Sequence, residues 1–266
     1  MLHPVIQSIL NRRGLSVPIN DGKKITLVLY GGVMAGVAGG ASVIALEELG
    51  LSGVFDNIFV VSAGLPNASY FLSKQTKLGT SIYYEDLNDR KFINFWRFWN
   101  PINTDKVVNA IRYLKPLDVK NVLSSKTKIF VRLFNIGTDK AEYLRLNEYC
   151  KTNDDYFSVL KTAITFSTIY NSYKIDGRRY VDGAMRNKGY ILDHFKCACK
   201  EEFTDMLIIY NKGTYNLNIS SDKICEIVLP TEMSNFETKD VILRQESIKA
   251  GLYVKQAFGV NEQITL

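Results

Sequence analysis

The sequence predicts an α/β fold built on a mainly parallel sheet. Two stretches near the amino end, residues 27–36 and 56–64, share one pattern: an apolar run, a turn of small residues and a helical period. Residues 25–30 are apolar on both faces, which is typical of an interior parallel strand because helices cover both of its sides. The alternation of strands with helices then implies right-handed crossover connections between parallel strands.

The other elements are expected in chain order around these two units. Residues 3–13 form a short amphipathic helix, since Val5, Ile6, Ile9 and Leu10 share one helical face. Apolar runs predict strands at 25–30, 57–61, 128–134, 206–210 and 226–229. Helical patterns cover 35–49, 63–75, 191–202 and 239–258, and a hairpin turns at Asp176-Gly177 within 173–181. A polar and aromatic region, residues 80–116, interrupts the alternation.

Composition indicates one globular unit. Of the 266 residues, 46% are hydrophobic and 23% are charged, which is ordinary for a domain with a sizeable core. The chain has no internal repeat, low-complexity tract or Pro-rich linker. We therefore expect residues 1–266 to form a single domain, whose core motifs span about residues 25–230 and on which the terminal helices pack.

Location and partners follow from the same survey. No apolar run approaches the ~20 residues that a membrane span needs, and residues 1–7 lack a basic segment before an apolar one. These features, with four scattered cysteines, predict a cytoplasmic protein with reduced thiols, and leave export without a cleavable signal open. The net charge of +6 suits transient contact with a membrane surface. No motif indicates a nucleic-acid partner or an oligomeric state.

A serine at the apex of the second turn points to acyl-transfer chemistry. Ser62 follows the apolar run 57–61 and precedes Ala63-Gly64, while Gly31 and Gly32 in the first turn can offer bare backbone N–H groups. A serine held at a strand-to-helix turn beside such amides is the arrangement that acyl transfer requires. Residues 35–41 of the following helix carry almost no side-chain bulk, although each glycine costs about 1 kcal/mol there. Either the sheet or a ligand must therefore approach this backbone closely.

The glycines at 31–36 do not fit a nucleotide loop. A Walker loop ends in Gly-Lys-Ser/Thr, but Gly36 is followed by Val37-Ala38. The dinucleotide fingerprint needs a glycine where this chain has Val33. Both nucleotide-binding classes are excluded.

A general base for Ser62 is the next requirement, and histidine is scarce. His3 lies at the amino end, and His194 is expected to be a surface residue of the helix 191–202, so a Ser-His-Asp triad is poorly supported. Asp182 follows a strand and precedes Gly183-Ala184, so it can point from a turn into a cleft. Alone it would be an ordinary Asp-Gly turn; combined with the two glycine-rich turns, it is the best candidate base.

Three stretches, in this order, resemble the patatin-like phospholipase family. Residues 29–36 resemble its glycine-rich oxyanion loop, 60–64 its G-x-S-x-G elbow, and 182–184 its D-G-[GA] motif. Residues 45–49, 63–70 and 161–168 show weaker likeness to family segments. Each motif alone is weak, whereas the ordered set of three is specific.

This resemblance implies a three-layer α/β/α sandwich and a Ser62–Asp182 dyad. Asp182 would accept the Ser62 proton while backbone N–H groups around Gly31, Gly32 and Val33 hold the oxyanion. The implied substrates are ester bonds of phospholipids or other acyl lipids. The dyad implies no metal and no cofactor.

Three positions depart from the family pattern. Ala35 stands where the family usually has a basic residue, Val33 replaces the third glycine of the oxyanion loop, and Val60 replaces the first glycine of the elbow. Valine restricts the positive φ angles that glycine allows, and Val60 must either widen the turn or pack elsewhere. These departures favour an alternative, a catalytically weak or inactive relative that binds lipid or protein.

An aromatic segment, residues 92–99, contains both tryptophans of the chain. Two interpretations stay open for it: packing on the core, or facing lipid, since Trp and Phe favour membrane interfaces.

Overall fold

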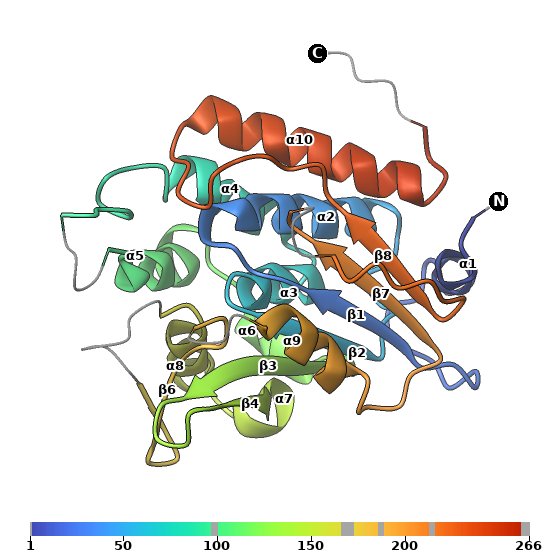
Figure 1. The fold of residues 1–266 in the computed structure, drawn as a ribbon, viewed down its shortest axis with the longest axis horizontal. Helices are drawn as coiled ribbons and strands as arrows, with labels where there is room; N and C mark the ends of the chain where they lie inside the picture. Colours follow the sequence, from blue (N-terminus) through green and yellow to red (C-terminus); the bar gives the residue numbers. More distant parts are fainter. Residues whose placement is uncertain (1, 97–100, 166–172, 186–188, 213–215, 262–266) are drawn as a thin grey trace.

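The computed structural model describes residues 2–96, 101–165, 173–185, 189–212 and 216–261. Within them, eight strands form one mixed, mostly parallel sheet with helices on both faces (Figure 1). The prediction of an α/β fold with a mainly parallel sheet is confirmed. None of the helices in these ranges has the length and apolar character of a bilayer-spanning segment.

The centre of the sheet is parallel and one end is antiparallel. The order is β5-β6-β3-β2-β1-β7-β8, with β4 on β3 as well. Parallel pairs join β8, β7, β1, β2 and β3, whereas β4, β5 and β6 pair antiparallel. The strands are β1 Ile25–Leu29, β2 Asn57–Val61, β3 Lys128–Asn135, β4 Lys140–Arg145, β5 Tyr173–Ile175, β6 Arg178–Asp182, β7 Asp205–Tyr210 and β8 Ile224–Val228.

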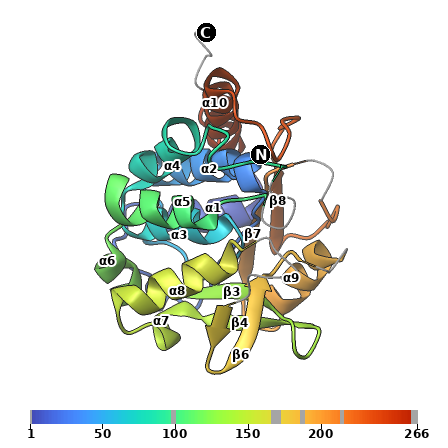
Figure 2. The same ribbon diagram turned by 90° about the vertical axis from the view of Figure 1, so that its left-hand side faces the viewer.

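Helices cover the sheet unequally, as the edge-on view shows (Figure 2). Helix α9 lies on one face, and most of the other helices lie on the opposite face. The helices are α1 Pro4–Asn11, α2 Gly36–Glu48, α3 Gly64–Leu72, α4 Thr76–Glu85, α5 Thr104–Asn109, α6 Val119–Ser124, α7 Leu146–Tyr149, α8 Asn153–Ala163, α9 Tyr190–Ala198 and α10 Asp240–Ala257. Two short non-α helices are η1 Val33–Ala35 and η2 Ala110–Leu114.

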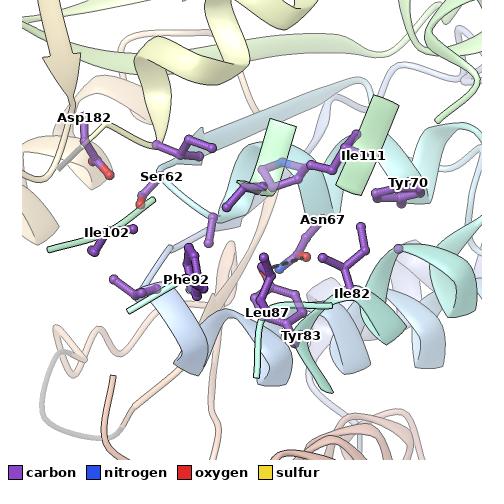
Figure 3. A pocket seen from close by; sticks show the side chains of 16 residues that line it. Ser62, Asn67, Tyr70, Ile82, Tyr83, Leu87, Phe92, Ile102, Ile111 and Asp182 are labelled. Carbon is purple, nitrogen blue, oxygen red and sulfur yellow. Dashed lines mark hydrogen bonds between the residues drawn. The ribbon is translucent and has the colours of Figure 1, made fainter. Parts of the chain in front are cut away.

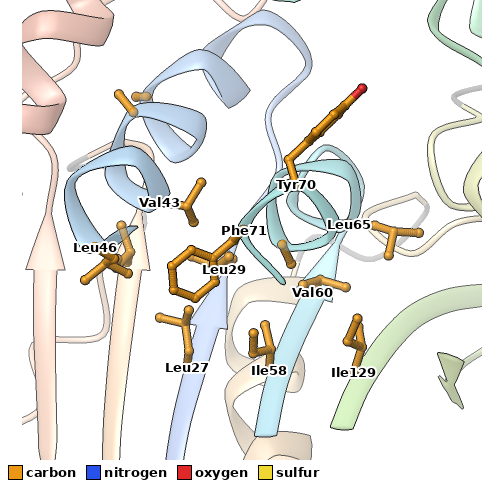
Figure 4. Packing of buried hydrophobic residues seen from close by; sticks show 14 of the residues in the cluster. Leu27, Leu29, Val43, Leu46, Ile58, Val60, Leu65, Tyr70, Phe71 and Ile129 are labelled. Carbon is orange, nitrogen blue, oxygen red and sulfur yellow. The ribbon is translucent and has the colours of Figure 1, made fainter. Parts of the chain in front are cut away.

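The strands supply a core to each face because successive side chains alternate. Leu27, Leu29, Ile58 and Val60 point toward α2 and α3 and belong to the large cluster (Figure 4). Their neighbours in sequence pack against α9, where a smaller cluster includes Val28, Tyr30, Phe59 and Val61. Central strands buried on both faces explain the continuous apolar runs.

Most predicted elements lie within a few residues of their expected bounds. The hairpin turns at Asp176-Gly177, with φ angles of 49° and 76° and Ile175 opposite Arg178, as a two-residue type I′ turn requires. Strand β4 was not predicted, and the expected helix 63–75 ends early: α3 stops at Leu72 and α4 begins at Thr76. The region 80–116 contains the end of α4, helix α5 and η2, and its described residues between α4 and α5 form turns and a single bridge, Ile93 with Ile102.

The small residues of α2 make room for polar side chains, and not for the sheet or a ligand as expected. A Cβ added to Gly40 would lie 2.7 Å from Thr80 Oγ1, and one on Gly39 would lie 2.9 Å from Asn211 Oδ1. These partners come from α4 and from the residue after β7. Gly39 and Gly40 therefore allow neighbouring elements to approach the α2 backbone.

Candidate active site

Strand register brings the ends of β2 and β6 together. Strand β4 pairs with residues 130–135 of β3 along one edge, so β2 and β6 must share the other edge. Strand β2 reaches Val61 opposite Arg132, and β6 arrives from the opposite direction with Asp182 opposite Leu133. Because Ser62 directly follows Val61, residues about 120 positions apart in the chain meet at adjacent registers of one strand.

Ser62 occupies a strained turn between β2 and α3. Its φ is 54°, in the left-handed region that non-glycine residues rarely adopt. A Cβ on Gly64 would lie 2.9 Å from Leu29 O, so the second glycine of the elbow is needed for close packing. Val60 does not crowd the turn, because its side chain is fully buried in the core beneath α3.

Gly31 lies directly against the elbow. A Cβ there would stand 2.5 Å from Ser62 Cβ and 2.8 Å from Val61 O. Gly32 and Val33 follow with φ angles of 150° and 52°, so Val33 adopts the left-handed conformation despite its branched side chain. The loop therefore keeps the shape of a glycine run at the cost of strain at Val33.

Two loop amides remain available to a ligand. The Met34 N–H donates to Asn235 O at 3.0 Å, but in the part of the chain that the structure describes the N–H groups of Gly32 and Val33 have no acceptor. They stand at the start of the continuous helical segment η1–α2, where the first N–H groups lack helical partners and the helix dipole favours negative charge. Of the loop residues, Val33 lines the cavity described below.

Asp182 is held in a turn by its own sequence. Its Oδ1 accepts a hydrogen bond from the Ala184 N–H at 2.8 Å. A Cβ on Gly183 would lie 2.3 Å from Arg132 O, so this position requires glycine. The fully buried Arg132 donates to Gly183 O and carries positive charge behind the turn.

Burial sets the protonation of Asp182, which is 3% exposed. Loss of solvation raises its pKa from 3.8 to about 6, opposed by the hydrogen bond from the Ala184 amide, by the nearby Ser62 hydroxyl and by the positive charge of Arg132. Above this pH the carboxylate can accept a proton, and its pKa near neutrality suits a general base.

Ser62 and Asp182 line the same cavity (Figure 3). They lie at one end, while Tyr70 and Ile82 lie toward the other. The cavity is largely apolar, and the empty space within it and at its open mouth amounts to about 580 Å³. Its lining is Val33, Ser62, Ala63, Pro66, Asn67, Tyr70, Gly79, Ile82, Tyr83, Leu87, Phe92, Ile102, Val107, Ile111, Ile164 and Asp182.

Neither histidine lies at this cavity. His194 was expected on a helix surface, and this was wrong: it is fully buried under the sheet, its Nδ1 lies 2.9 Å from the Tyr143 hydroxyl, and burial lowers its pKa to about 3. His3 Nδ1 accepts the Val5 N–H and so caps α1. Among the described residues, no cluster of metal-ligating side chains is present either.

Two polar residues of the site were missed in the sequence. The Asn67 amide donates to Gly36 O at 2.9 Å and its Oδ1 accepts from the Tyr83 hydroxyl at 3.2 Å. The Asn211 amide donates to Tyr30 O and Gly31 O of the glycine-rich loop. For Asn211 a signal was present, since it directly follows an apolar run at the carboxyl end of a strand, where ligand sites of α/β sheets lie.

The aromatic segment, residues 92–99, was expected either to pack on the core or to face lipid, and its described residues differ in exposure. Phe92 is buried and lines the cavity, whereas Phe95 is 61% and Trp96 is 91% exposed. Phe95 packs edge-on against Phe236. The last three aromatic-segment residues, 97–99, lie outside the described ranges.

Comparison with known proteins agrees with this fold. The family model described as patatin-like phospholipase matches residues 27–192. The crystal structure of VipD from Legionella pneumophila has a similar fold, with a TM-score of 0.52 and 10% identity over 93% of this chain and 70% of that one. No curated protein matches the sequence. Because the family model covers more than half of the chain and includes all three motifs, the chain belongs to the patatin-like phospholipase family.

Proposed function

We propose that the protein is a serine acyl hydrolase that cleaves carboxylic ester bonds of acyl lipids through Ser62 and Asp182. One observation carries this proposal. A serine in a left-handed elbow and a buried carboxylate with a pKa of about 6 line the same apolar cavity. Family membership supports a lipid acyl hydrolase in general terms.

The proposed reaction has two halves. Ser62 Oγ attacks the ester carbonyl carbon while its proton passes to Asp182, and the resulting oxyanion accepts hydrogen bonds from the amides at 31–33. The C–O bond then breaks, and Asp182 returns the proton to the leaving alkoxide. Water attacks the acyl-serine, gives a proton to Asp182, and the free acid leaves as that proton returns to Ser62 Oγ.

The cavity favours an acyl chain as the bound group. Beyond Ser62 its walls are mainly aliphatic and aromatic: Ile82, Leu87, Phe92, Ile102, Val107 and Ile111. Such a lining binds hydrocarbon by removing apolar surface from water and offers few hydrogen bonds to a headgroup. The headgroup of a lipid ester would therefore stay at the mouth.

Transient contact with a lipid surface is part of the proposal. Phe95 and Trp96 are exposed, and they follow Phe92 of the cavity wall within a few residues. Exposed aromatic side chains favour the interface between headgroups and hydrocarbon. We expect Trp96→Ser to lower hydrolysis of vesicle lipid several-fold and leave hydrolysis of a water-soluble ester unchanged; equal loss on both substrates would contradict the membrane contact.

The alternative is a catalytically weak or inactive relative that binds lipid or protein. It is favoured by the strained Val33 and by Ala35, which leaves the loop without the expected basic side chain. Assays of wild type, Ser62→Ala and Asp182→Ala on a chromogenic ester and on phospholipid separate the two. The hydrolase predicts activity in wild type alone; equal residual rates in all three proteins would eliminate it.

A further inference from the structure

Asn211 holds the glycine-rich loop after β1 by hydrogen bonds to its backbone. It is 4% exposed, directly follows β7 and does not line the cavity. Its Nδ2 donates to both Tyr30 O and Gly31 O, each at 2.9 Å. A side-chain amide has two N–H groups on that nitrogen, so one group serves each carbonyl.

These two hydrogen bonds fix two successive peptide planes. In a trans peptide the C=O and the N–H of the next residue point in opposite directions. Holding Tyr30 O therefore directs the Gly31 N–H away from Asn211, and holding Gly31 O does the same for the Gly32 N–H. Glycine imposes no such direction by itself, since it populates many φ angles almost equally.

The surroundings of Asn211 are shaped to hold its amide in place. A Cβ on Gly39 would stand 2.9 Å from Asn211 Oδ1, so α2 leaves room for this side chain. On the other side, a Cβ on Gly32 would lie 3.9 Å from Asn211 Nδ2. The amide is thus enclosed between the helix and the loop that it fastens.

We propose that Asn211 is a positioning residue for acyl transfer: it aims the loop amides at the oxyanion before substrate binds. This inference rests on the proposed hydrolase function. A donor fixed in advance stabilises the transition state without reorganisation. Because Asn211 does not touch the substrate, its loss should slow the chemical step and change substrate binding little.

The test uses the rate and the endpoint of labelling by a fluorophosphonate probe. Ser62 Oγ attacks the phosphorus of the probe and displaces fluoride, and negative charge develops on the phosphoryl oxygen, so the labelling rate depends on the loop amides. Its endpoint counts the folded sites. We compare Asn211→Ala with Asn147→Ala, a control that deletes an amide bonding Val122 O and the Ile129 N–H at the other end of β3.

We expect Asn211→Ala to label to the wild-type endpoint about 10- to 100-fold more slowly, below the loss for a direct oxyanion donor. The kcat for ester hydrolysis should fall by a similar factor while KM stays within about threefold. Asn147→Ala should label at the wild-type rate. Asn211→Asp keeps the side-chain volume but has no donor for the carbonyls, so it should be as slow and provides the test if the alanine variant does not fold.

Two results would overturn the inference: an unchanged labelling rate, or a lower endpoint at the wild-type rate, which is the mark of a purely structural role. If wild type itself neither labels nor hydrolyses esters, it is the proposed function that fails.

Discussion

The two walls of the cavity are built by different means. The turn wall is lined by Val33, Ser62, Ala63 and Asp182 and is formed by the turns at residues 30–36, 61–64 and 182–184, where backbone geometry decides the shape. Ser62 and Val33 adopt positive φ angles there, and Gly31, Gly64 and Gly183 allow contacts that a Cβ would prevent. The second wall, the helical wall, is formed by α4, α5, η2 and the turns between them, and its surface is provided by the side chains of Ile82, Leu87, Phe92, Ile102, Val107 and Ile111.

This difference matches two tasks: the turn wall suits placement of reacting groups, and the helical wall suits binding of an acyl chain. Donors and acceptors for a reaction must be placed to within a fraction of an ångström, and tight turns with strained residues achieve this at a cost in stability. An acyl chain needs only apolar volume, which many combinations of side chains can supply. Changes in the turn wall should therefore abolish activity, and changes in the helical wall should alter which ester is preferred.

The largest effect is expected for Asp182→Asn. It keeps the size of the side chain and the hydrogen bond from Ala184 but removes the base, so kcat should fall on the order of 10³-fold. Asp176→Asn, in the exposed turn of the same hairpin, is the matched control and should keep full activity. Steady-state hydrolysis of a soluble ester measures both. Comparable losses in the two variants would show that the carboxylate has no special role.

Gly31→Ala tests whether backbone contact shapes the turn wall. The added methyl would press on Ser62 and Val61, and displacement of about 1 Å at a reacting group can cost on the order of 10²-fold in rate. Gly251→Ala in α10 is the control, because its Cβ would meet Ala41 O at an ordinary 3.7 Å. It should keep activity and raise the free energy of unfolding by about 1 kcal/mol. An active Gly31→Ala enzyme would contradict the close packing of loop and elbow.

The pH profile sharpens the comparison at Asp182. Since burial raises its pKa to about 6, kcat/KM should rise about tenfold per pH unit below that value and level off above it. A single titration midpoint near the unperturbed carboxyl value of about 4 would contradict burial of the active base.

The raised pKa of Asp182 affects stability and activity in opposite directions: activity rises with pH, whereas the free energy of unfolding falls. Because the pKa is raised in the folded state, the protonated carboxyl stabilises the fold fully below about pH 4, and this contribution is lost as pH rises through 6. The free energy of unfolding of Asp182→Asn should therefore exceed that of wild type by on the order of 2 kcal/mol at pH 8. At pH 4 the variant should show no such gain. Denaturant unfolding at both values measures the difference.

Ile82→Phe tests the helical wall and should give the smallest effect. A larger ring at the far end of the cavity should lower kcat/KM for a palmitoyl ester about tenfold relative to a butyryl ester. Ile248→Phe adds the same bulk on the exposed face of α10 and should leave that ratio unchanged. The ratio cancels any general loss of folded protein. An unchanged ratio in Ile82→Phe would show that the acyl chain does not bind at this end of the cavity.

The same contrast explains what the sequence could predict. The turns at 29–36, 60–64 and 182–184 carry glycine and small residues at spacings that few structures share, so their placement at strand ends was predictable. The helical wall was not, because residues 80–116 show no strand–helix alternation and an apolar side chain does not reveal what it faces. Strand β4 alternates weakly and lies at an edge, with its side chains partly exposed.

Asn211 and His194 show most clearly what the sequence alone could not predict. Both roles depend on contacts made across the sheet from distant elements: Asn211 with the loop after β1, and His194 with Tyr143 of β4. A single polar residue next to an apolar run does not encode its partner. The pairing becomes visible once the strand order is known.

The most direct test of the Ser62–Asp182 account is to trap the acyl-enzyme. Wild type is mixed with a lipid ester, quenched in acid within one turnover and digested for mass spectrometry. We predict an added acyl group on the peptide that contains Ser62, and none in Ser62→Ala. An acyl group on another side chain, or hydrolysis that persists in Ser62→Ala, would contradict it.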